Sequence, residues 1–369
     1  MNKKLVGMAC AALLLGLQPL TACSQQQPAP AQSQPAQTEE QAETTFTEGA
    51  DSTCKATGYT NMTTSHPDYF LKEGDKVAVI SPSALPTREQ ADATIAGLKD
   101  WGYVPVEGKH VCDEGRTLED CRSDLMWALE DPDIAAIFCV RGGYAASEVM
   151  DTISLDAIRN AQKPIIGYSD ITVYHAAWTA AGLPSIHSSM SASFGDLPQD
   201  CVEVEKQLLK GEVPAYECAV GELSKDGDAE GILIGGNLST LTVTLDTAYD
   251  CTRLDQPYIL FLEEVGEDMR HIHRFITILD HQGALDNAAG IVFGEWADVP
   301  IELSDYDGMS RGGKFTSVAD MINREFLSDT DVPVAFGFPA GHAEANYPLL
   351  MGEKAHMKVS NGTLTLTWE

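Results

Sequence analysis

Basic residues are scarce in this chain of 369 residues, which contains 24 Lys and Arg against 55 Asp and Glu. The formal net charge is −31 at pH 7 with histidine counted as neutral. A field of this sign repels the phosphate backbone of nucleic acids and anionic lipid surfaces. We therefore expect no nucleic-acid partner, and the charge says little about a small substrate.

Motifs for metal or thiol redox chemistry are also missing from the sequence. No Cys-x-x-Cys pair occurs, which argues against a zinc ribbon or a thioredoxin-like site. No His-Glu-x-x-His segment or clustered Cys/His spacing occurs either. A metal cofactor is therefore not expected.

Long apolar runs are absent after the first 22 residues, because no later segment has the 18 consecutive apolar residues typical of a membrane span. Residues 1–22 place Lys3 and Lys4 before a short apolar core, the pattern of an export signal. The core ends at Leu20-Thr21-Ala22-Cys23, which resembles the lipobox of bacterial lipoproteins and implies lipidation of Cys23. We expect a protein of the cell envelope, lipid-anchored on the extracytoplasmic side of a membrane; an ordinary secretory signal is the alternative.

Residues 23–66 are predicted to be a flexible tether. Between residues 24 and 51 the chain is rich in Gln, Pro, Ala, Ser, Thr and Glu, with almost no large apolar residue. Such a segment cannot bury enough surface to offset the entropy lost on ordering.

Seven cysteines follow the lipobox, and an exported chain permits disulfides. Cys139 lies inside the apolar run IAAIFCV, where a small buried thiol is expected. The other six allow 15 pairings. Short loops favour Cys112–Cys121 and Cys201–Cys218 as bridges.

The chain after the tether alternates buried strands with helices. Strands are predicted at 76–81, 103–106, 134–140 and 164–166, and helices at 87–101, 118–129, 145–150 and 155–161. This alternation is typical of a mostly parallel sheet covered by helices. The ends of its strands place polar groups on one edge, including Ser81-Pro-Ser83, Arg141-Gly-Gly143 and Ser169.

Ser169 lies where an apolar run stops at Gly167 and a helical pattern begins at Asp170. A serine on such a turn lies beside unpaired backbone N–H groups at the positive end of a helix. The same groups suit a nucleophile, because they can stabilise an oxyanion. The alternative is a helix cap, and the hydrolase motif Gly-x-Ser-x-Gly is incomplete because Ile171 replaces its second glycine.

The second half of the chain has a different pattern. Strands are predicted at 258–262, 290–294 and 332–338, helices at 271–280 and 315–326, and a hairpin over 354–368 around Asn361-Gly362. The predicted fold is α/β: an N-terminal mostly parallel sheet flanked by helices, plus a C-terminal mixed α/β domain with an antiparallel component. We place the domains at 67–195 and 230–369, with a crossover linker at 196–229.

Five motifs in order resemble the LD-carboxypeptidase family of serine peptidases, which includes the microcin C self-immunity peptidases. They are KVAVISPS, IAAIFCVRGGY, PIIGYSDIT, GGNLSTL with YILFLEEVGE, and FGFPAGHAEANYPLLMG. The resemblance extends over about residues 74–368, nearly all of the predicted folded chain.

The resemblance implies a catalytic triad of Ser169 as nucleophile, Glu263 as carboxylate and His342 as general base. It implies an oxyanion hole from the backbone N–H of Asp170 and one N–H of the turn after the third strand, where we favour Gly143 over Gly142. Neighbouring strand residues point to opposite faces, so Glu264 is the alternative to Glu263.

His271 and His273 lie near this carboxylate in the sequence. Their helical spacing prevents both from facing one site. We interpret them as ordinary helix residues.

The activity implied by the resemblance is hydrolysis of the L,D bond that releases terminal D-alanine from murein tetrapeptide, through an acyl-enzyme on Ser169 and without a cofactor. The family also implies a homodimer. One alternative is a microcin-immunity-type amidase of peptidyl-nucleotides, which export argues against. Another is a wall-peptide-binding lipoprotein without catalysis. Many family members are cytoplasmic, so the lipobox departs from the family and leaves the physiological role open.

Overall fold

The computed structural model describes residues 54–62, 69–190, 197–300 and 315–368. The predicted signal peptide, Cys23 and most of the predicted tether lie outside these ranges. The residues that the structure describes form one compact unit. Within the described ranges, no helix has both the length and the apolar composition to cross a membrane.

One sheet has six strands in the order β12-β6-β5-β4-β2-β3. Five are parallel and come from the first half of the chain; β12 (Leu349–Met351) comes from the second half and pairs antiparallel with β6. The five are β2 (Lys76–Ile80), β3 (Val104–Glu107), β4 (Ile134–Cys139), β5 (Ile165–Gly167) and β6 (Ser185–His187).

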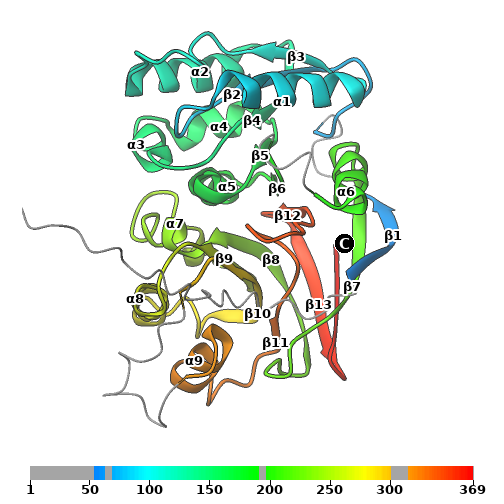
Figure 1. Cartoon of the computed structure of the whole chain (residues 1–369), viewed down its shortest axis with the longest axis vertical. Helices are drawn as coiled ribbons and strands as arrows, with labels where there is room; N and C mark the ends of the chain where they lie inside the picture. The colour runs from blue at the N-terminus through cyan, green and yellow to red at the C-terminus, as the bar shows by residue number, and fades with distance from the viewer. Residues whose placement is uncertain (1–53, 63–68, 191–196, 301–314, 369) are drawn as a thin grey trace, which may run out of the picture. The chain divides into compact units, whose positions relative to one another are not determined.

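Helices accompany this sheet, with α1 and α2 beside β2 and β3 in Figure 1. Thr87 and Thr117 begin these two helices with capping boxes, in which side chain and backbone satisfy each other's free groups. The helices are α1 (Arg88–Asp100), α2 (Leu118–Glu130), α3 (Ala146–Met150), α4 (Leu155–Ala161) and α5 (Thr172–Ala181).

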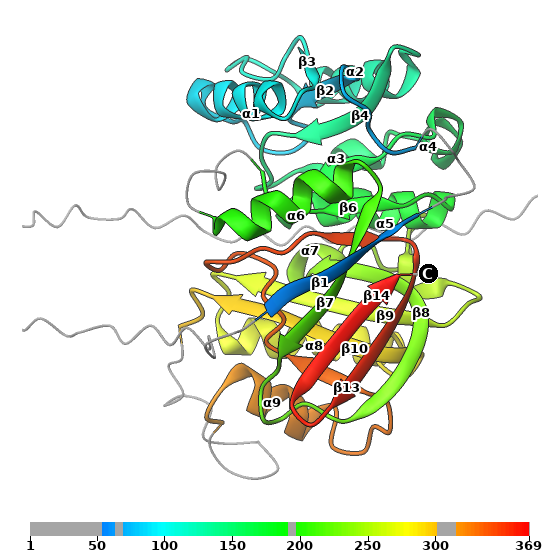
Figure 2. The same ribbon diagram turned by 90° about the vertical axis from the view of Figure 1, so that its right-hand side faces the viewer.

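The other sheet has eight strands in the order β1-β7-β14-β13-β8-β9-β10-β11. The last four are parallel and the first four pair antiparallel, so the sheet is mixed (Figure 2). Its strands are β1 (Cys54–Asn61), β7 (Glu212–Ala219), β8 (Gly227–Asn237), β9 (Tyr258–Val265), β10 (Ala288–Ala297), β11 (Val334–Phe336), β13 (Lys354–Ser360) and β14 (Thr363–Trp368). The helices in this half are α6 (Gln199–Leu209), α7 (Leu238–Thr242), α8 (Met269–His281) and α9 (Val318–Glu325).

This architecture confirms the predicted fold class, including the hairpin of β13 and β14. Strands β1, β6, β7, β8 and β12 and helix α6 were not predicted. Helix α6 and strand β7 occupy the stretch predicted as a crossover linker. Strand β1 lies where the end of the tether was expected.

Helix α5 lies between the two sheets and packs against both β6 and β8 (Figure 1). A helix enclosed in this way must be apolar on all sides, and nearly every α5 side chain is buried. The polar groups of its two large aromatic side chains are hydrogen-bonded. Tyr174 Oη donates to Pro82 O at 2.7 Å, and Trp178 Nε1 donates to Lys163 O at 2.8 Å. The helix that follows Ser169 is therefore held rigidly.

The predicted disulfides are wrong. The bridge joins Cys54 to Cys218 across β1 and β7, where the two residues are register partners. Cys112, Cys121 and Cys201 are free thiols, as are Cys139 and Cys251. Strand pairing between distant segments, and not loop length, decides which cysteines meet. The buried thiol predicted at Cys139 is confirmed.

Candidate active site

The carboxyl ends of the parallel strands of both sheets meet at the candidate site. Ser169 follows β5, and Asn237 and Glu263 lie at the ends of β8 and β9. Thr172 at the start of α5 joins the two sheets, because its Oγ1 accepts the Asn237 N–H at 2.9 Å. In open α/β sheets this edge is where functional groups gather.

Ser169 has a left-handed backbone, with φ at +65°. Non-glycine residues rarely adopt this conformation, and it is kept where the surrounding structure enforces it. Residues Ser169–Ile171 form a single 3-10 turn that leads into α5. A half-buried serine is thereby presented at a sharp turn between strand and helix, a geometry that also occurs in strained turns that carry a nucleophile.

The Gly142–Gly143 turn lies against Ser169. A Cβ added to Gly142 would be 3.1 Å from Ser169 Oγ and 3.2 Å from the Asp170 backbone nitrogen, so only glycine allows this approach. The Gly142 carbonyl accepts the Ala84 N–H at 3.2 Å. Because the peptide is trans, the Gly143 N–H points to the opposite side.

The Asp170 carboxylate connects three strand ends. Its Oδ2 accepts the Ala146 N–H at 2.9 Å, at the start of α3, and a hydrogen bond from the Ser83 hydroxyl. Ser83 Oγ also lies 3.2 Å from Tyr144 O. The turn after β4 is thus fixed to the turn that carries Ser169.

His342 lies beside Glu263, with 2.7 Å between Nδ1 and Oε2. The Glu263 side chain is 0% exposed. Burial disfavours the charged imidazole, but the charge and hydrogen bond of Glu263 outweigh burial and raise the pKa of His342. Gly341 makes room for this pair, because a Cβ there would be 2.6 Å from Glu263 Oε2.

Tyr168 connects the Glu263–His342 pair to the turn of Ser169. The Tyr168 ring packs on the His342 ring with 4.7 Å between centroids, and Tyr168 is the residue directly before Ser169. His342 lies in the loop from β11 to β12, which crosses from one sheet to the other. The loop therefore carries the imidazole to the end of β5.

Glu264, the alternative carboxylate, faces the opposite side of β9. It accepts hydrogen bonds from Asn237 Nδ2 at 2.9 Å and Ser239 N at 2.7 Å, and so binds the start of α7. His271 and His273 lie on α8: His271 pairs with Glu267 at 2.8 Å, and the His273 ring packs against Phe326.

Sequence reasoning missed two buried histidines next to the site. His175 on α5 lies 2.9 Å from Gly167 O and 2.8 Å from Ser185 Oγ. His187 ends β6, and neither of its ring nitrogens has a hydrogen-bond partner among the described residues. Burial lowers the pKa of His187 well below its ordinary value, so the ring is neutral. The end of a parallel strand at His187 was the available signal, but β6 itself was not predicted.

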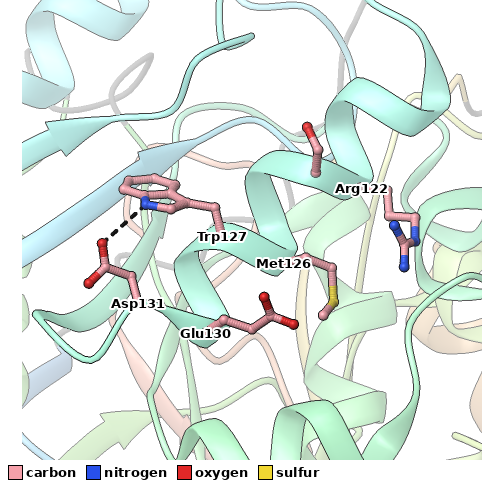
Figure 3. Close-up of a pocket in the computed structure, with 6 residues that line it drawn as sticks. Arg122, Met126, Trp127, Glu130 and Asp131 are labelled. Carbon is pink, nitrogen blue, oxygen red and sulfur yellow. Dashed lines mark hydrogen bonds between the residues drawn. The ribbon is translucent and has the colours of Figure 1, made fainter.

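A groove away from this site runs along α2 (Figure 3). Its lining includes Arg122, Met126 and Glu130, and Trp127 Nε1 donates to Asp131 Oδ2 at 3.2 Å. This groove has no histidine beside a nucleophile in its lining. Among the residues that the structure describes, no group of His, Cys, Asp and Glu is arranged to hold a metal ion.

Two family models match the chain. The LD-carboxypeptidase N-terminal domain matches residues 77–188, and the LD-carboxypeptidase C-terminal domain matches residues 230–357. The Ser169 turn lies in the first match, and Glu263 and His342 lie in the second.

Curated relatives cover most of the chain. A Streptomyces coelicolor relative is 31% identical over 307 residues, which is 80% of this chain and 94% of the relative. The murein tetrapeptide carboxypeptidase of Pseudomonas aeruginosa is 28% identical and covers 76% of this chain and 92% of its own length. The microcin C7 self-immunity protein of Escherichia coli is 25% identical, with coverages of 83% and 97%.

The fold is also similar to a solved structure. The crystal structure of muramoyltetrapeptide carboxypeptidase from Oxalobacter formigenes has a TM-score of 0.68 and 26% identity. The similarity covers 79% of this chain and 97% of that one.

Proposed function

The chain belongs to the LD-carboxypeptidase family of serine peptidases, and we propose that it hydrolyses the L,D bond that releases terminal D-alanine from murein tetrapeptide. The murein tetrapeptide and muramoyltetrapeptide carboxypeptidases among its relatives support this substrate class. The observation that carries the proposal is the buried Glu263–His342 pair, packed through Tyr168 against the turn that presents Ser169.

In the proposed reaction, His342 Nε2 takes the proton of Ser169 Oγ as the oxygen attacks the carbonyl carbon of the scissile bond. Nδ1 is the ring nitrogen beside Glu263, so Nε2 is the one left for the substrate side. Glu263 fixes that tautomer and stabilises the imidazolium as it forms.

The oxyanion is held by the backbone N–H of Asp170 and by that of Gly143. His342 then gives its proton to the leaving amine, so that D-alanine departs and an acyl ester remains on Ser169. Attack by water, with His342 again as base, releases the tripeptide and restores the serine. The balance of the reaction is one water consumed for one amide bond broken.

The test is incubation of the pure protein with tetrapeptide and with its pentapeptide counterpart, with products analysed by mass spectrometry. We expect loss of one alanine from tetrapeptide alone, and no product with Ser169→Ala. Tight binding of tetrapeptide without cleavage would instead favour a binding protein. Cleavage of an aminoacyl-nucleotide amide with no action on tetrapeptide would favour the microcin-immunity chemistry.

We also propose export and lipid anchoring through Cys23, on the sequence pattern described above. The expected result is a membrane-associated protein whose Cys23→Ser variant appears in the soluble envelope fraction with unchanged specific activity. An unmodified Cys23 in a membrane-free wild-type protein would contradict the anchor. The homodimer implied by the resemblance stays a prediction.

A further inference from the structure

The loop that carries His342 is closed at its base by its own backbone. Tyr347 N donates to Pro339 O at 3.0 Å, and Gly341 N donates to Asn346 Oδ1 at 3.0 Å. The nine residues from Pro339 to Tyr347 include no helix or strand. The place of His342 therefore depends on what holds the closing residue, Tyr347.

Tyr347 is held by two elements distant in the sequence. Its ring is 5% exposed and packs edge-on against Tyr216 of β7, with 5.6 Å between centroids. Its hydroxyl lies 3.1 Å from the Cys54 carbonyl oxygen and within hydrogen-bonding distance of the Asp200 carboxylate. Cys54 begins β1 and Asp200 lies in the first turn of α6.

Strand β1 is the edge strand of its sheet and pairs only with β7 among the described strands. The ends of edge strands are the places where pairing opens first. Cys54 is such an end residue, and its disulfide to Cys218 fixes it covalently to β7. The residue that offers its carbonyl to Tyr347 is thus the residue that the disulfide restrains (Figure 2 shows β1 along β7).

We infer that Tyr347 is a positioning residue for His342, and that the Cys54–Cys218 disulfide makes catalysis depend on the oxidised state of the protein. The inference rests on the proposed function in one respect, since it takes His342 as the general base. Reduction by a dithiol transfers two electrons and two protons to the disulfide, giving two thiols and the oxidised dithiol. The freed end of β1 then removes the Cys54 contact of the Tyr347 hydroxyl and leaves Asp200 as its partner, so the His342 loop loosens.

The first experiment compares wild type, Tyr347→Phe and Cys218→Ser as oxidised full-length proteins, with kcat and KM for tetrapeptide over pH 5–9. Tyr347→Phe keeps the ring and removes only the hydroxyl. We expect kcat to fall about 10-fold in both variants with KM within about two-fold, as expected for misplacement of a catalytic group. Treatment of wild type with dithiol should give the same loss, and it should add little to the loss in Tyr347→Phe.

The pH profile separates positioning from simple stability. His342 lies beside Glu263, whose charge favours its protonation, as does the charge of Glu264 from the other side of β9; the nearby His187 is neutral. If the loop loosens, the acid limb of kcat/KM moves down toward the ordinary histidine value of about 6.5. A lower melting temperature with unchanged kcat and unchanged acid limb would overturn the inference. Cys112→Ser is the control, because Cys112 is a free thiol and reduction leaves it unchanged.

A second measurement does not depend on the substrate. Histidine NMR titration of the Ser169→Ala protein reports the pKa of His342 directly, oxidised and reduced. We expect the value to fall on reduction, even if tetrapeptide proves not to be the substrate. An identical titration in both states would refute the inference, whereas inactivity of oxidised wild type on tetrapeptide alone would refute only the proposed function.

Discussion

The left-handed backbone of Ser169 is maintained by its immediate neighbours. Gly167 lies so close to Ile171 that a Cβ would be 2.9 Å from the Ile171 side chain, and the Ile171 N–H binds Tyr168 O at 3.2 Å. A left-handed non-glycine residue costs on the order of 1–3 kcal/mol. The turn keeps this conformation because the Asp170 carboxylate is hydrogen-bonded to the start of α3 and the following helix α5 is buried. A change of the Ser169 backbone would disturb both.

The raised pKa of His342 predicts the pH dependence of activity. A general base must be neutral, so kcat/KM should rise with pH through a value above the ordinary histidine pKa of about 6.5. In Glu263→Gln, burial and the weaker effect of the Glu264 charge remain, and burial is the larger, so the acid limb should move to lower pH. We expect kcat to fall by about 10²–10⁴-fold, as in other triads that lose their carboxylate.

Glu267→Gln is the matched control for this charge. Glu267 pairs with His271 at the start of α8 and is half-buried, with a 31% exposed side chain. Its removal should leave both kcat and the acid limb unchanged. A kcat/KM that stays constant from pH 5 to 8 in wild type would rule out His342 as the base.

Gly341 allows the close packing of the Glu263–His342 pair, which a substitution can test. An alanine there would bring Cβ within 2.6 Å of Glu263 Oε2 and 2.9 Å of Glu263 Cβ, so the whole carboxylate must move. Gly341→Ala should lower kcat by about 100-fold through misplacement of Glu263. Gly337→Ala is the control, because its φ is also positive (+85°) but nothing lies within 4 Å of the added Cβ. Equal activity losses in the two variants, measured as kcat on folded protein, would mean that backbone strain and not the contact is responsible.

Residue patterns located the ends of strands where Ser169 and the glycine turn lie, because a buried run followed by a helix start is a local signal. They left Glu263 and Glu264 open, and the structure places Glu263 beside His342. They could not find Tyr168 or Asn346, because contacts of these residues join segments far apart in the chain.

At the scale of elements, the site depends on how α3, α5 and β2 are joined. Asp170 precedes α5, and its carboxylate binds the first N–H of α3 and the serine after β2. A carboxylate at a helix start is favoured by the unpaired N–H groups there. One side chain thus aligns the turn of Gly143 with the turn of Ser169.

Removal of this carboxylate should disturb both turns. In Asp170→Ala the backbone N–H of residue 170 remains, so any loss of activity comes from the side chain. The Ala146 N–H and the Ser83 hydroxyl lose a buried acceptor, which should lower the free energy of unfolding by about 1–3 kcal/mol. We expect kcat to fall about 10- to 100-fold, since the two proposed oxyanion donors, the N–H groups of residues 143 and 170, move apart.

Asp156→Ala provides the comparison, because Asp156 lies exposed in the first turn of α4 and pairs with Arg159 at the surface. Urea unfolding and kcat should both be nearly unchanged there. If Asp170→Ala behaved like Asp156→Ala in both measurements, the conclusion that the Asp170 carboxylate aligns the two turns would be wrong.

Elements with a strong local pattern were predicted well, including the capped helices α1 and α2 and the β13–β14 hairpin. The short strand β6 and the acidic stretch of α6 and β7 were not. Strand β1 alternates in exposure and contains Gly58, so its sequence indicates little until β7 lies beside it. Tertiary contacts decide such segments.

At the scale of the whole molecule, the two sheets exchange strands at opposite ends of the chain. Strand β12 from the C-terminal half completes the N-terminal sheet, and β1 from the N-terminal end completes the C-terminal sheet. The His342 loop and the Cys54–Cys218 bridge both belong to this exchange. Such pairings between distant segments cannot be deduced from residue spacing, which is why the disulfide prediction was wrong.

The stability of the whole molecule should depend on pH through Glu205 of α6. Its side chain is 1% exposed, and burial raises its pKa to about 8, with the nearby Ser188 hydroxyl opposing the shift. The unfolded value is about 4.3, so the unfolded chain loses its proton first. The stabilisation is complete below pH 4.3 and is lost as the pH rises through about 8.

Glu205→Gln keeps the shape of the side chain and removes this titration. The variant should match wild type near pH 4.5 and exceed it at pH 9 by up to about 5 kcal/mol in the free energy of unfolding. Urea unfolding of oxidised protein at both pH values measures the difference, in which the titration of all other groups cancels. Glu203→Gln, on the same helix but with a 55% exposed side chain, should show no such trend. A difference between Glu205→Gln and wild type that is the same at both pH values would show that Glu205 ionises in the folded protein as readily as in water.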